Sequence, residues 1–397
     1  MTTTKVAARS TTTHETALLD DLPELVAWLR GQAAEIEDQK RLPPHVIERL
    51  HAAGLFKLTL PEHHGGLGLT PDKAWNIIFD IARGSASAAW LISLCAANVV
   101  MLTRLSDRAQ SELFDGNRLV VSALTGAVPR NLVASHAEGG ITLSGAWGYA
   151  SGIDAANWVG VLVPIGDPVR TFFALIPKTR FSIDHDSWNV LGMRGTGSKD
   201  VVLPTTFIPD YRLMDWALLQ QGGKHPDCTC SERLDSYPIN ALFAASILAP
   251  SLGVARAIVD EFEAFLMRRL HNTNPDHRDP HAMSYLAQAR ATVTLACRAL
   301  ITEAEAPPAA AGGGVPTLRM KAEMRVRIVM IARSAMAACQ QLFSAAGGQI
   351  IPTGTPFERL LRDFHAMYSH ILLQPEPISE NCGRIELGLE PLPNTRI

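Results

Sequence analysis

The feature that most constrains this chain is the change of residue pattern along its 397 residues. From residue 17 to 118, apolar residues recur at helical spacing, as in LPELVAWLRGQAAEIE and PPHVIERLHAAGLFKL. From 119 to 213, short β-rich runs such as LVVSALT, WVGVLVPI and RTFFALIP are separated by Gly, Pro, Asn and Asp. Helical spacing returns over 240–397. The order predicts a mostly α protein with a central β unit: an N-terminal helical domain, a small antiparallel β-barrel domain and a C-terminal four-helix bundle.

The segments before and between these units are polar. Residues 1–16 are expected to be a disordered leader, and residues 214–239 a connecting loop. Pro375 and Pro377 should end the last bundle helix. The four predicted bundle helices span 240–270, 280–305, 317–346 and 355–374. No predicted strand leads into a Gly-x-Gly-x-x-Gly turn, so the sequence disfavours a dinucleotide-binding Rossmann domain.

Composition excludes several classes of function. The 36 Lys and Arg nearly balance the 39 Asp and Glu, and no basic stripe occurs, so we expect no nucleic-acid partner. The apolar runs 88–102 and 241–255 are shorter than the ~20 residues of a membrane span. With no signal-peptide pattern at the start, the sequence predicts a cytoplasmic protein and no membrane partner. Charged residues are only 19% of the chain, against a usual ~25%, which suggests surface buried between subunits.

The cysteines do not form a recognisable metal-binding pattern. None of the six stands in a Cys-x-x-Cys pair or near a histidine at zinc-finger spacing. The sequence therefore predicts no metal site and reduced thiols. The six are Cys95, Cys228, Cys230, Cys297, Cys339 and Cys382.

Two turns in the β unit carry most of the chemical information. The stretch WNVLGMRGTGSKDVV, at 188–202, combines three glycines with hydroxyls and an arginine, so it can cradle an anionic or heteroaromatic ligand. The stretch WGYASG, at 147–152, places a serine and a glycine beside aromatic residues at a strand end. A glycine-rich turn alone is most simply a hairpin connection. Two such turns in one small unit indicate the walls of a single pocket.

Over about residues 17–390 the chain resembles the acyl-CoA dehydrogenase family. The resemblance is carried by the order of the three units, by PEHHGGLGL after the second helix, and by the pair WGYASG and WNVLGMRGTGSKDVVL. It also includes AAGGQ followed by RLLRDFH. Within the family the chain looks most like the monooxygenase branch, the oxygenase components of two-component flavin-dependent aromatic hydroxylases.

The last predicted helix distinguishes the branches. In acyl-CoA dehydrogenases a Glu-Gly-Thr sequence shortly after an Arg-Asp pair often supplies the carboxylate base. Here Arg362-Asp363 is followed by FHAMYSHILLQ, which has no carboxylate, and His370 takes its place. Imidazole suits a phenol or indole proton near neutral pH, although a lone helix histidine is most simply a core residue. Helical spacing predicts one shared face for Arg362, Ala366, Ser369, His370 and Leu373.

The resemblance implies roles for further residues. His370 and Ser151 would be catalytic, with Ser151 bonding near the flavin N5. The substrate would contact Trp90, Ser369 and Leu373. The flavin ring would be held by Ser122, Thr125, Trp147, Ser151, Gly152, Trp188, Arg194, Gly195, Thr196 and Ser198. The flavin of a neighbouring subunit would be covered by Gln340, Phe343, Gly347 and Gly348. The plainer interpretation of the last two is a helix end.

As a whole, the resemblance implies an oxygenase that receives reduced FAD or FMN from a separate NAD(P)H-dependent flavin reductase. With O2 it would hydroxylate a small aromatic substrate, phenolic, indole-type or polycyclic, through a C4a-hydroperoxyflavin. A shared flavin site implies a homo-oligomer, either a dimer or a tetramer. Three alternatives stay open on the same fold: an acyl-CoA desaturase with bound FAD, an amine N-oxygenase, and a non-catalytic binding protein.

Overall fold

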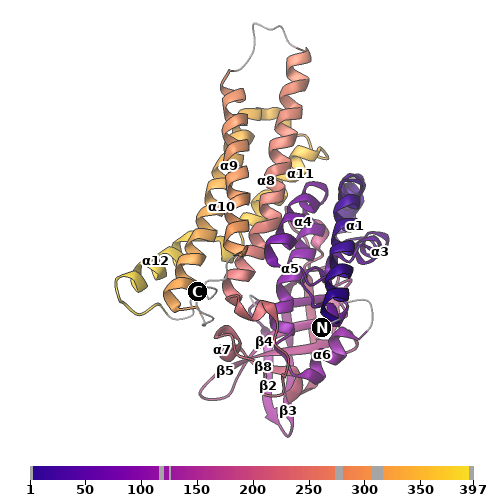
Figure 1. Ribbon diagram of the computed structural model, residues 1–397, viewed down its shortest axis with the longest axis vertical. Coiled ribbons are helices and arrows are strands. Elements are labelled where there is room, and N and C mark those ends of the chain that lie inside the picture. The colour runs from indigo at the N-terminus through magenta and orange to yellow at the C-terminus, as the bar shows by residue number, and fades with distance from the viewer. Residues whose placement is uncertain (1–2, 116–119, 125–126, 273–279, 306–315, 393–397) are drawn as a thin grey trace.

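The computed structural model describes residues 3–115, 120–124, 127–272, 280–305 and 316–392. Within them, N-terminal helices are followed by two small sheets and then by a bundle of long helices that rises away from the sheets (Figure 1). The prediction of a mostly α fold with a central β unit is confirmed.

The N-terminal helices assemble around α5 (Ala86–Leu102), which packs against α4 and against the first bundle helix, α8 (Ile239–Asn272). Ser85 caps α5 by accepting a hydrogen bond from Ala88 N at 3.2 Å. The α5 sequence contains no charged residue, and nearly every side chain in it is buried. The other elements are α1 (Thr3–Gly31), α2 (Ala33–Asp38), α3 (Pro44–Ala52), η1 (Leu55–Lys57), η2 (Glu62–His64), α4 (Pro71–Gly84) and α6 (Asp107–Phe114).

Residues 3–16, expected to be disordered, are the first turns of α1. No glycine or proline precedes Pro23, so nothing in the sequence interrupts the helix at this end. Further along, Leu18, Leu22 and Leu25 recur at helical spacing and are buried where α1 packs along α4. The first residues therefore belong to a helix although they contain no apolar run.

The β unit consists of two four-stranded sheets, with strand orders β1-β4-β5-β8 and β2-β3-β7-β6, rather than one closed barrel. The pairings are antiparallel, as predicted, except that β1 runs parallel to β4. The strands are β1 (Val121–Leu124), β2 (Arg130–Ala137), β3 (Gly140–Ala150), β4 (Trp158–Ile165), β5 (Arg170–Pro177), β6 (Ser182–Asp184), β7 (Lys199–Pro209) and β8 (Leu213–Asp215).

The connection between the β unit and the bundle has more structure than the predicted loop over 214–239. Strand β8 pairs with β5, and Asp215 then caps the short helix α7 (Trp216–Gln220) by accepting from Leu218 N at 3.0 Å. A 3-10 turn, η6 (Arg233–Ser236), precedes α8. This connection carries two cysteines, Cys228 and Cys230.

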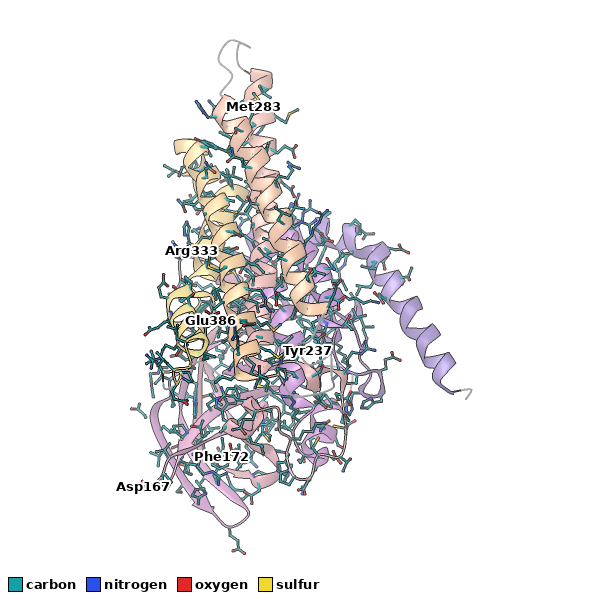
Figure 2. The ribbon with its side chains drawn as sticks, turned by 60° about the vertical axis from the view of Figure 1, so that its left-hand side comes forward. Asp167, Phe172, Tyr237, Met283, Arg333 and Glu386 are labelled. Atoms are coloured by element: carbon teal, nitrogen blue, oxygen red, sulfur yellow. The ribbon has the colours of Figure 1, made fainter. Side chains whose placement is uncertain are left out.

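The bundle contains the four predicted helices: α8, α9 (Pro280–Glu305), α10 (Leu318–Ala346) and α11 (Pro356–Tyr368). Figure 2 shows its length, with Met283 near the far end and Phe172 in the sheets. A further helix, α12 (Pro375–Glu386), was not predicted. Pro375 stands at its first position, where a missing N–H costs nothing, so this proline begins a helix rather than only ending one.

By length and composition alone, α8 and α10 could cross a membrane. In α8, however, 94% of the apolar window is buried inside the molecule, as in the core helix of a bundle. In α10 the share is 44%, so much of that helix is not covered by its own chain.

Candidate active site

A line of side chains joins α5 to the two polar turns of the β unit. The indole Nε1 of Trp90 donates to Ser151 Oγ at 3.3 Å, and Ser151 Oγ lies 2.8 Å from Ser198 Oγ. Ser198 Oγ in turn lies 2.7 Å from Thr196 Oγ1. The backbone ties the turns together as well, since Gly152 N donates to Thr196 O at 2.8 Å. The structure therefore brings the two turns together, and their role as the walls of one pocket stays a prediction.

The hydrogen bonds in this line have a fixed direction. Thr196 Oγ1 donates to Met193 O at 2.8 Å, which uses its only hydrogen. Thr196 must then accept from Ser198, and Ser198 must accept from Ser151. The Ser151 proton is thus committed inside the protein, and Ser151 can offer only a lone pair to a ligand.

The aromatic residue that faces outward at this site is Tyr149, which sequence reasoning missed. Its side chain is 74% exposed, and its ring meets the Trp188 ring edge to face with centroids 6.1 Å apart. The predicted Trp147 is fully buried in the core. Strict alternation along β3 predicts the same face for both residues. A register shift between Trp147 and Ala150, with Tyr149 at a φ of 62°, turns the tyrosine outward.

His370 lies beside Trp90 but not on the predicted helix face. Helix α11 ends at Tyr368, and His370 is the N-cap of a 3-10 turn, η9 (Ile371–Leu373). The one-face prediction is therefore wrong beyond Tyr368. Ser369 is exposed, with its hydroxyl bonded to Ala366 O at 2.8 Å. Leu373 is buried, and the His370 and Trp90 rings meet edge to face with centroids 5.8 Å apart.

The hydrogen bonding of His370 fixes its neutral tautomer. Nδ1 accepts from Leu372 N at 3.2 Å, so in the neutral ring the proton resides on Nε2. The ring is then a hydrogen-bond donor at Nε2. To act there as a base, it would first have to give up the bond to Leu372.

Arg325 on α10 supports this turn and was also missed by sequence reasoning. Its side chain is fully buried, and its Nη2 donates to Leu372 O at 3.0 Å. The Leu372 peptide is therefore held at both ends, by His370 at N–H and by Arg325 at C=O. The only sequence signal for this role was the presence of an arginine at a core position of the α10 helix.

The 188–198 loop is anchored on α11 by Asp363. Its Oδ1 accepts from Met193 N at 2.5 Å, and burial of the carboxyl raises its pKa to about 6. Gly192 and Gly195 allow the close approach. A Cβ on Gly192 would lie 2.2 Å from Arg362 O, and one on Gly195 would lie 2.1 Å from Ile36 Cγ2. The guanidinium of Arg194 faces Glu37, at 3.8 Å, which is an ion pair within the protein.

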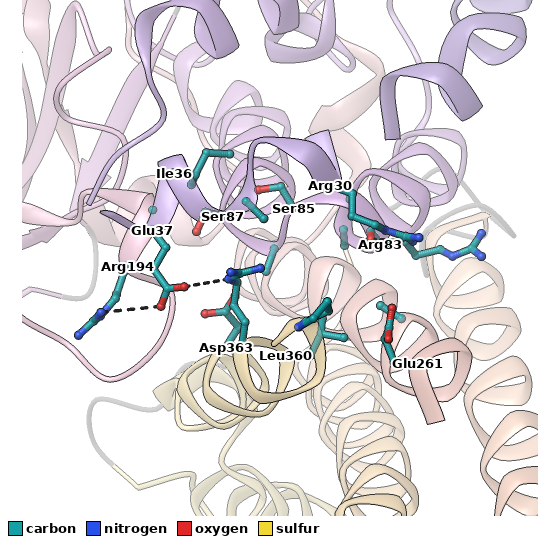
Figure 3. A pocket seen from close by; sticks show the side chains of 18 residues that line it. Arg30, Ile36, Glu37, Arg83, Ser85, Ser87, Arg194, Glu261, Leu360 and Asp363 are labelled. Atoms are coloured by element: carbon teal, nitrogen blue, oxygen red, sulfur yellow. Dashed lines mark hydrogen bonds and ion pairs between the residues drawn. The ribbon is translucent and has the colours of Figure 1, made fainter. Parts of the chain in front are cut away.

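A cleft of about 70 Å³ lies beside the 3-10 turn η4 (Arg194–Thr196), lined among others by Glu37, Ser87 and Asp363 (Figure 3). None of Trp90, Ser151 and His370 lines it. Sites for drug-sized ligands occupy roughly 300–1,000 Å³, so this cleft is too small for a flavin or a polycyclic substrate.

Comparison with known proteins identifies the chain. Models for the acyl-CoA dehydrogenase N-terminal and C-terminal domains match residues 14–114 and 245–375. The oxygenase subunit HsaA of a flavin-dependent monooxygenase from Rhodococcus jostii is 30% identical over 385 residues, which cover 95% of this chain and 99% of that one. The chain is a flavin-dependent monooxygenase of the acyl-CoA dehydrogenase family.

Two further relatives support this assignment. The crystal structure of the HsaA monooxygenase from Mycobacterium tuberculosis matches with a TM-score of 0.87 at 27% identity, covering 95% of this chain and 99% of that chain. The oxygenase component of an FADH(2)-dependent resorcinol hydroxylase from Rhizobium is 27% identical and covers 91% of this chain and 92% of its own.

The residues at the joined turns of this flavin-dependent monooxygenase fit a flavin ring. The exposed ring of Tyr149 offers a flat apolar surface beside the turn. Ser151 offers a lone pair to an N–H, and Gly152, at a φ of 72°, keeps the turn tight. Reduced flavin and O2 are the cofactor and co-substrate.

The remaining predicted flavin contacts that the structure describes stand on β1 and around the end of α10. Ser122 is buried in β1, opposite Val159 of β4, and Thr125 lies outside the described residues. Phe343 packs inside the bundle against Phe357 and Phe364, with ring centroids 5.4 and 5.6 Å away. Gln340, Gly347 and Gly348 are exposed at the end of α10. Their contact with a neighbouring subunit's flavin remains a prediction.

Proposed function

We propose that this monooxygenase hydroxylates a small aromatic substrate, as the oxygenase component of a two-component system whose separate NAD(P)H-dependent reductase supplies reduced flavin. The observation that carries the proposal is the series of contacts from His370 through Trp90 to Ser151. These contacts join the turn that follows α11 to the 147–152 and 188–198 turns of the β unit. Relatives named as a resorcinol hydroxylase, a p-hydroxyphenylacetate 3-hydroxylase and an indole-3-acetate monooxygenase support an aromatic substrate.

In this scheme the reduced flavin, when bound, would supply two electrons to O2, of which one oxygen atom enters the substrate and the other leaves as water. Ser151 accepts a hydrogen bond from a ligand N–H, because its own proton points to Ser198. The neutral His370 ring carries its proton at Nε2, because Nδ1 accepts from Leu372 N. We therefore assign His370 to hydrogen-bond donation rather than to deprotonation of the substrate in its resting form. Trp90 fixes both groups and, with other buried apolar side chains of α5, keeps water out.

The acyl-CoA desaturase alternative is less well supported. It requires a carboxylate base near the end of α11, and the acid available there is Asp363, which is buried and accepts from Met193 N. The next acid, Glu376, is exposed at the start of α12. An amine N-oxygenase would use the same oxygen donor and is distinguished by its substrate alone.

We further propose that the protein is a homo-oligomer, a dimer or a tetramer. Leu295 on α9 and Met330 and Met336 on α10 are exposed apolar side chains on the bundle. The low charged fraction supports the same conclusion. A second subunit on α10 would put Gln340, Gly347 and Gly348 at a subunit boundary, where the predicted shared flavin site requires them.

One experiment tests the proposal. The purified protein is mixed without oxygen with chemically reduced FAD or FMN and a phenol or an indole, and oxygen is then admitted. We expect a transient flavin absorbance that free reduced flavin does not give, followed by one hydroxylated product per O2. Reduction of bound oxidised FAD by an acyl-CoA, with no hydroxylated product from any aromatic tested, would contradict it.

A further inference from the structure

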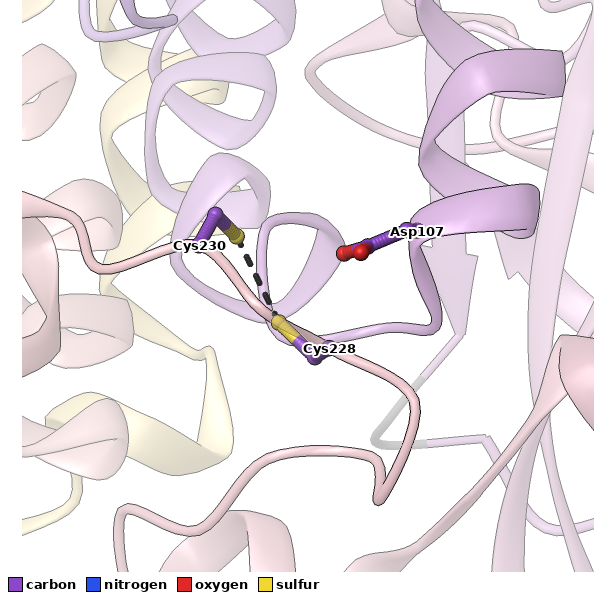
Figure 4. Close-up of side chains that lie close together, drawn as sticks. All are labelled: Asp107, Cys228 and Cys230. Atoms are coloured by element: carbon purple, nitrogen blue, oxygen red, sulfur yellow. Dashed lines mark hydrogen bonds between the residues drawn. The ribbon is translucent and has the colours of Figure 1, made fainter.

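Two cysteines and an aspartate converge at the junction of the connecting segment and α6. Cys228 Sγ and Cys230 Sγ lie 3.4 Å apart, side by side, as Figure 4 shows. The Asp107 carboxylate, at the start of α6, faces them, and one ligand atom from each residue lies within 4.8 Å of the others. All three residues are partly exposed, so an ion can enter from solvent.

The spacing matches a single tetrahedral ion. Zinc binds cysteine sulfur at about 2.3 Å and carboxylate oxygen at about 2.0–2.2 Å, so two sulfurs on one ion lie roughly 3.7 Å apart. The observed sulfur separation of 3.4 Å requires only a small adjustment. A disulfide would use only the two sulfurs, whereas a metal ion would also be bound by the carboxylate.

The surroundings already hold the three groups in place. Asp107 Oδ1 and Oδ2 accept from Thr229 N at 3.0 Å and from Thr229 Oγ1 at 2.7 Å, which fixes the turn between the cysteines. Gln110, one turn after Asp107 on α6, is held by bonds from Nε2 to Leu105 O at 2.8 Å and to Thr103 O at 3.1 Å. Its Nε2 lies 3.5 Å from Cys228 Sγ and 3.4 Å from Cys230 Sγ. Groups that orient ligands in this way are a regular part of metal sites.

A buried positive charge stands next to the cluster. The side chain of Arg104 is fully buried, donates from Nε to Asp235 Oδ1 at 3.3 Å, and is close enough to Cys228 for their charges to interact. Its Nη1 has no hydrogen-bond partner in the part of the chain that the structure describes. Two thiolates and a carboxylate around a divalent cation carry a net charge of −1, which the Arg104 guanidinium would balance.

We propose that Cys228, Cys230 and Asp107 bind a thiophilic divalent cation of the zinc class. Binding releases the two thiol protons, forms two metal–sulfur bonds and one metal–oxygen bond, and leaves a fourth position for water. The ion clamps the segment between α7 and η6 onto the N-terminal domain. This role is structural and independent of the oxygenation chemistry. The proposal departs from the sequence prediction of no metal site. That prediction considered residues close together in sequence, and Asp107 is far from the cysteines in sequence.

The test uses Co²⁺ and Zn²⁺ alone as probes on the full-length protein after chelation and reduction. We expect one Co²⁺ per chain with sulfur-to-cobalt charge-transfer absorption, displaced by Zn²⁺, and a higher midpoint of thermal unfolding with Zn²⁺. Cys228→Ser and Cys230→Ser should each weaken binding by at least about 100-fold, and Asp107→Asn by at least about 10-fold. Cys297→Ser, which removes a partly buried thiol on α9, should bind normally.

Two outcomes would overturn the proposal. The first is the absence of charge-transfer absorption in the reduced wild-type protein at saturating Co²⁺. The second is absorption retained in both serine variants. Circular dichroism shows whether each variant folds. If a variant does not fold, the cysteines of the folded wild-type protein are alkylated instead. Alkylation should also abolish Co²⁺ binding.

Discussion

The imidazole of His370 meets the indole of Trp90 edge to face, with ring centroids 5.8 Å apart and planes at 70°. Trp90 belongs to the N-terminal helices and donates to Ser151 in the β unit, so side chains from three parts of the fold meet at one indole. The position of each polar group in the site therefore depends on packing from the other two units. This dependence makes the site sensitive to single substitutions.

Replacing His370 with alanine should lower the rate of hydroxylation by about 100-fold, because removal of one positioned hydrogen-bond donor typically costs about 10²–10³-fold. Binding of reduced flavin should change little. Rapid-reaction absorbance gives flavin binding, and chromatography gives product. The matched control is His136→Ala, an exposed histidine on β2, which should behave as wild type. Normal product formation by the His370 variant would refute its assigned role.

Replacing Trp90 with phenylalanine should retain the ring contact with His370 but remove the hydrogen bond to Ser151. We expect the free energy of unfolding to fall by about 1 kcal/mol, the usual net value of such a bond. The ratio of product to hydrogen peroxide should also fall, because Ser151 loses the group that orients it. Trp28→Phe, on α1, is the control. An unchanged product-to-peroxide ratio would show that the indole N–H is dispensable.

Replacing Arg325 with methionine should disturb the 3-10 turn η9, which His370 caps, although we place no ligand in contact with Arg325. Leu372 O loses its donor, so we expect a loss of about 1.5–3 kcal/mol in the free energy of unfolding. Hydroxylation should slow while the affinity for reduced flavin is retained. Arg333→Met, on the exposed side of the same helix, is the control. Equal activity in the two variants would mean that Arg325 does not position His370.

The sequence predicted the larger features because they depend on local patterns. The periodicities located the helical, β and bundle units, and the family motifs located the turns with Ser151 and Ser198. The finer geometry depends on partners far away in the sequence. Tyr149 faces outward because of a bulge, which two-residue periodicity cannot predict.

The end of α11 shows the same limit. The helical spacing that included His370 continues to residue 374, yet the helix stops at Tyr368. There His370 Nδ1 accepts a hydrogen bond from Leu372 N, and Arg325 of α10 donates one to Leu372 O. A single-sequence pattern contains no information about that second helix, so neither the turn nor Arg325 could be predicted.

Replacing Gly195 with alanine should weaken the docking of the 188–198 loop, which we propose holds the flavin. The added Cβ would lie 2.1 Å from Ile36 Cγ2 and 2.9 Å from Ser87 Oγ, so the loop must shift. Overpacking of this kind typically costs about 1–3 kcal/mol. Affinity for reduced flavin, measured by fluorescence titration, should fall. Gly31→Ala meets nothing within 4 Å and should be neutral; similar flavin affinities for the two variants would argue against loop docking as the cause.

Replacing Asp363 with asparagine should remove a pH dependence of stability. Burial raises the pKa of this carboxyl from 3.8 to about 6, so the folded protein binds the proton more tightly than the unfolded chain. The resulting stabilisation is complete below pH 4 and is lost as the pH rises to about 6, a change of about 3 kcal/mol. Asparagine keeps an oxygen to accept from Met193 N but cannot ionise. In urea unfolding from pH 4 to 7, the free energy of unfolding of the variant relative to wild type should therefore rise up to about pH 6. Above that pH the difference should stay constant. A constant difference over the whole range would mean that Asp363 is not held in an environment that disfavours its charge.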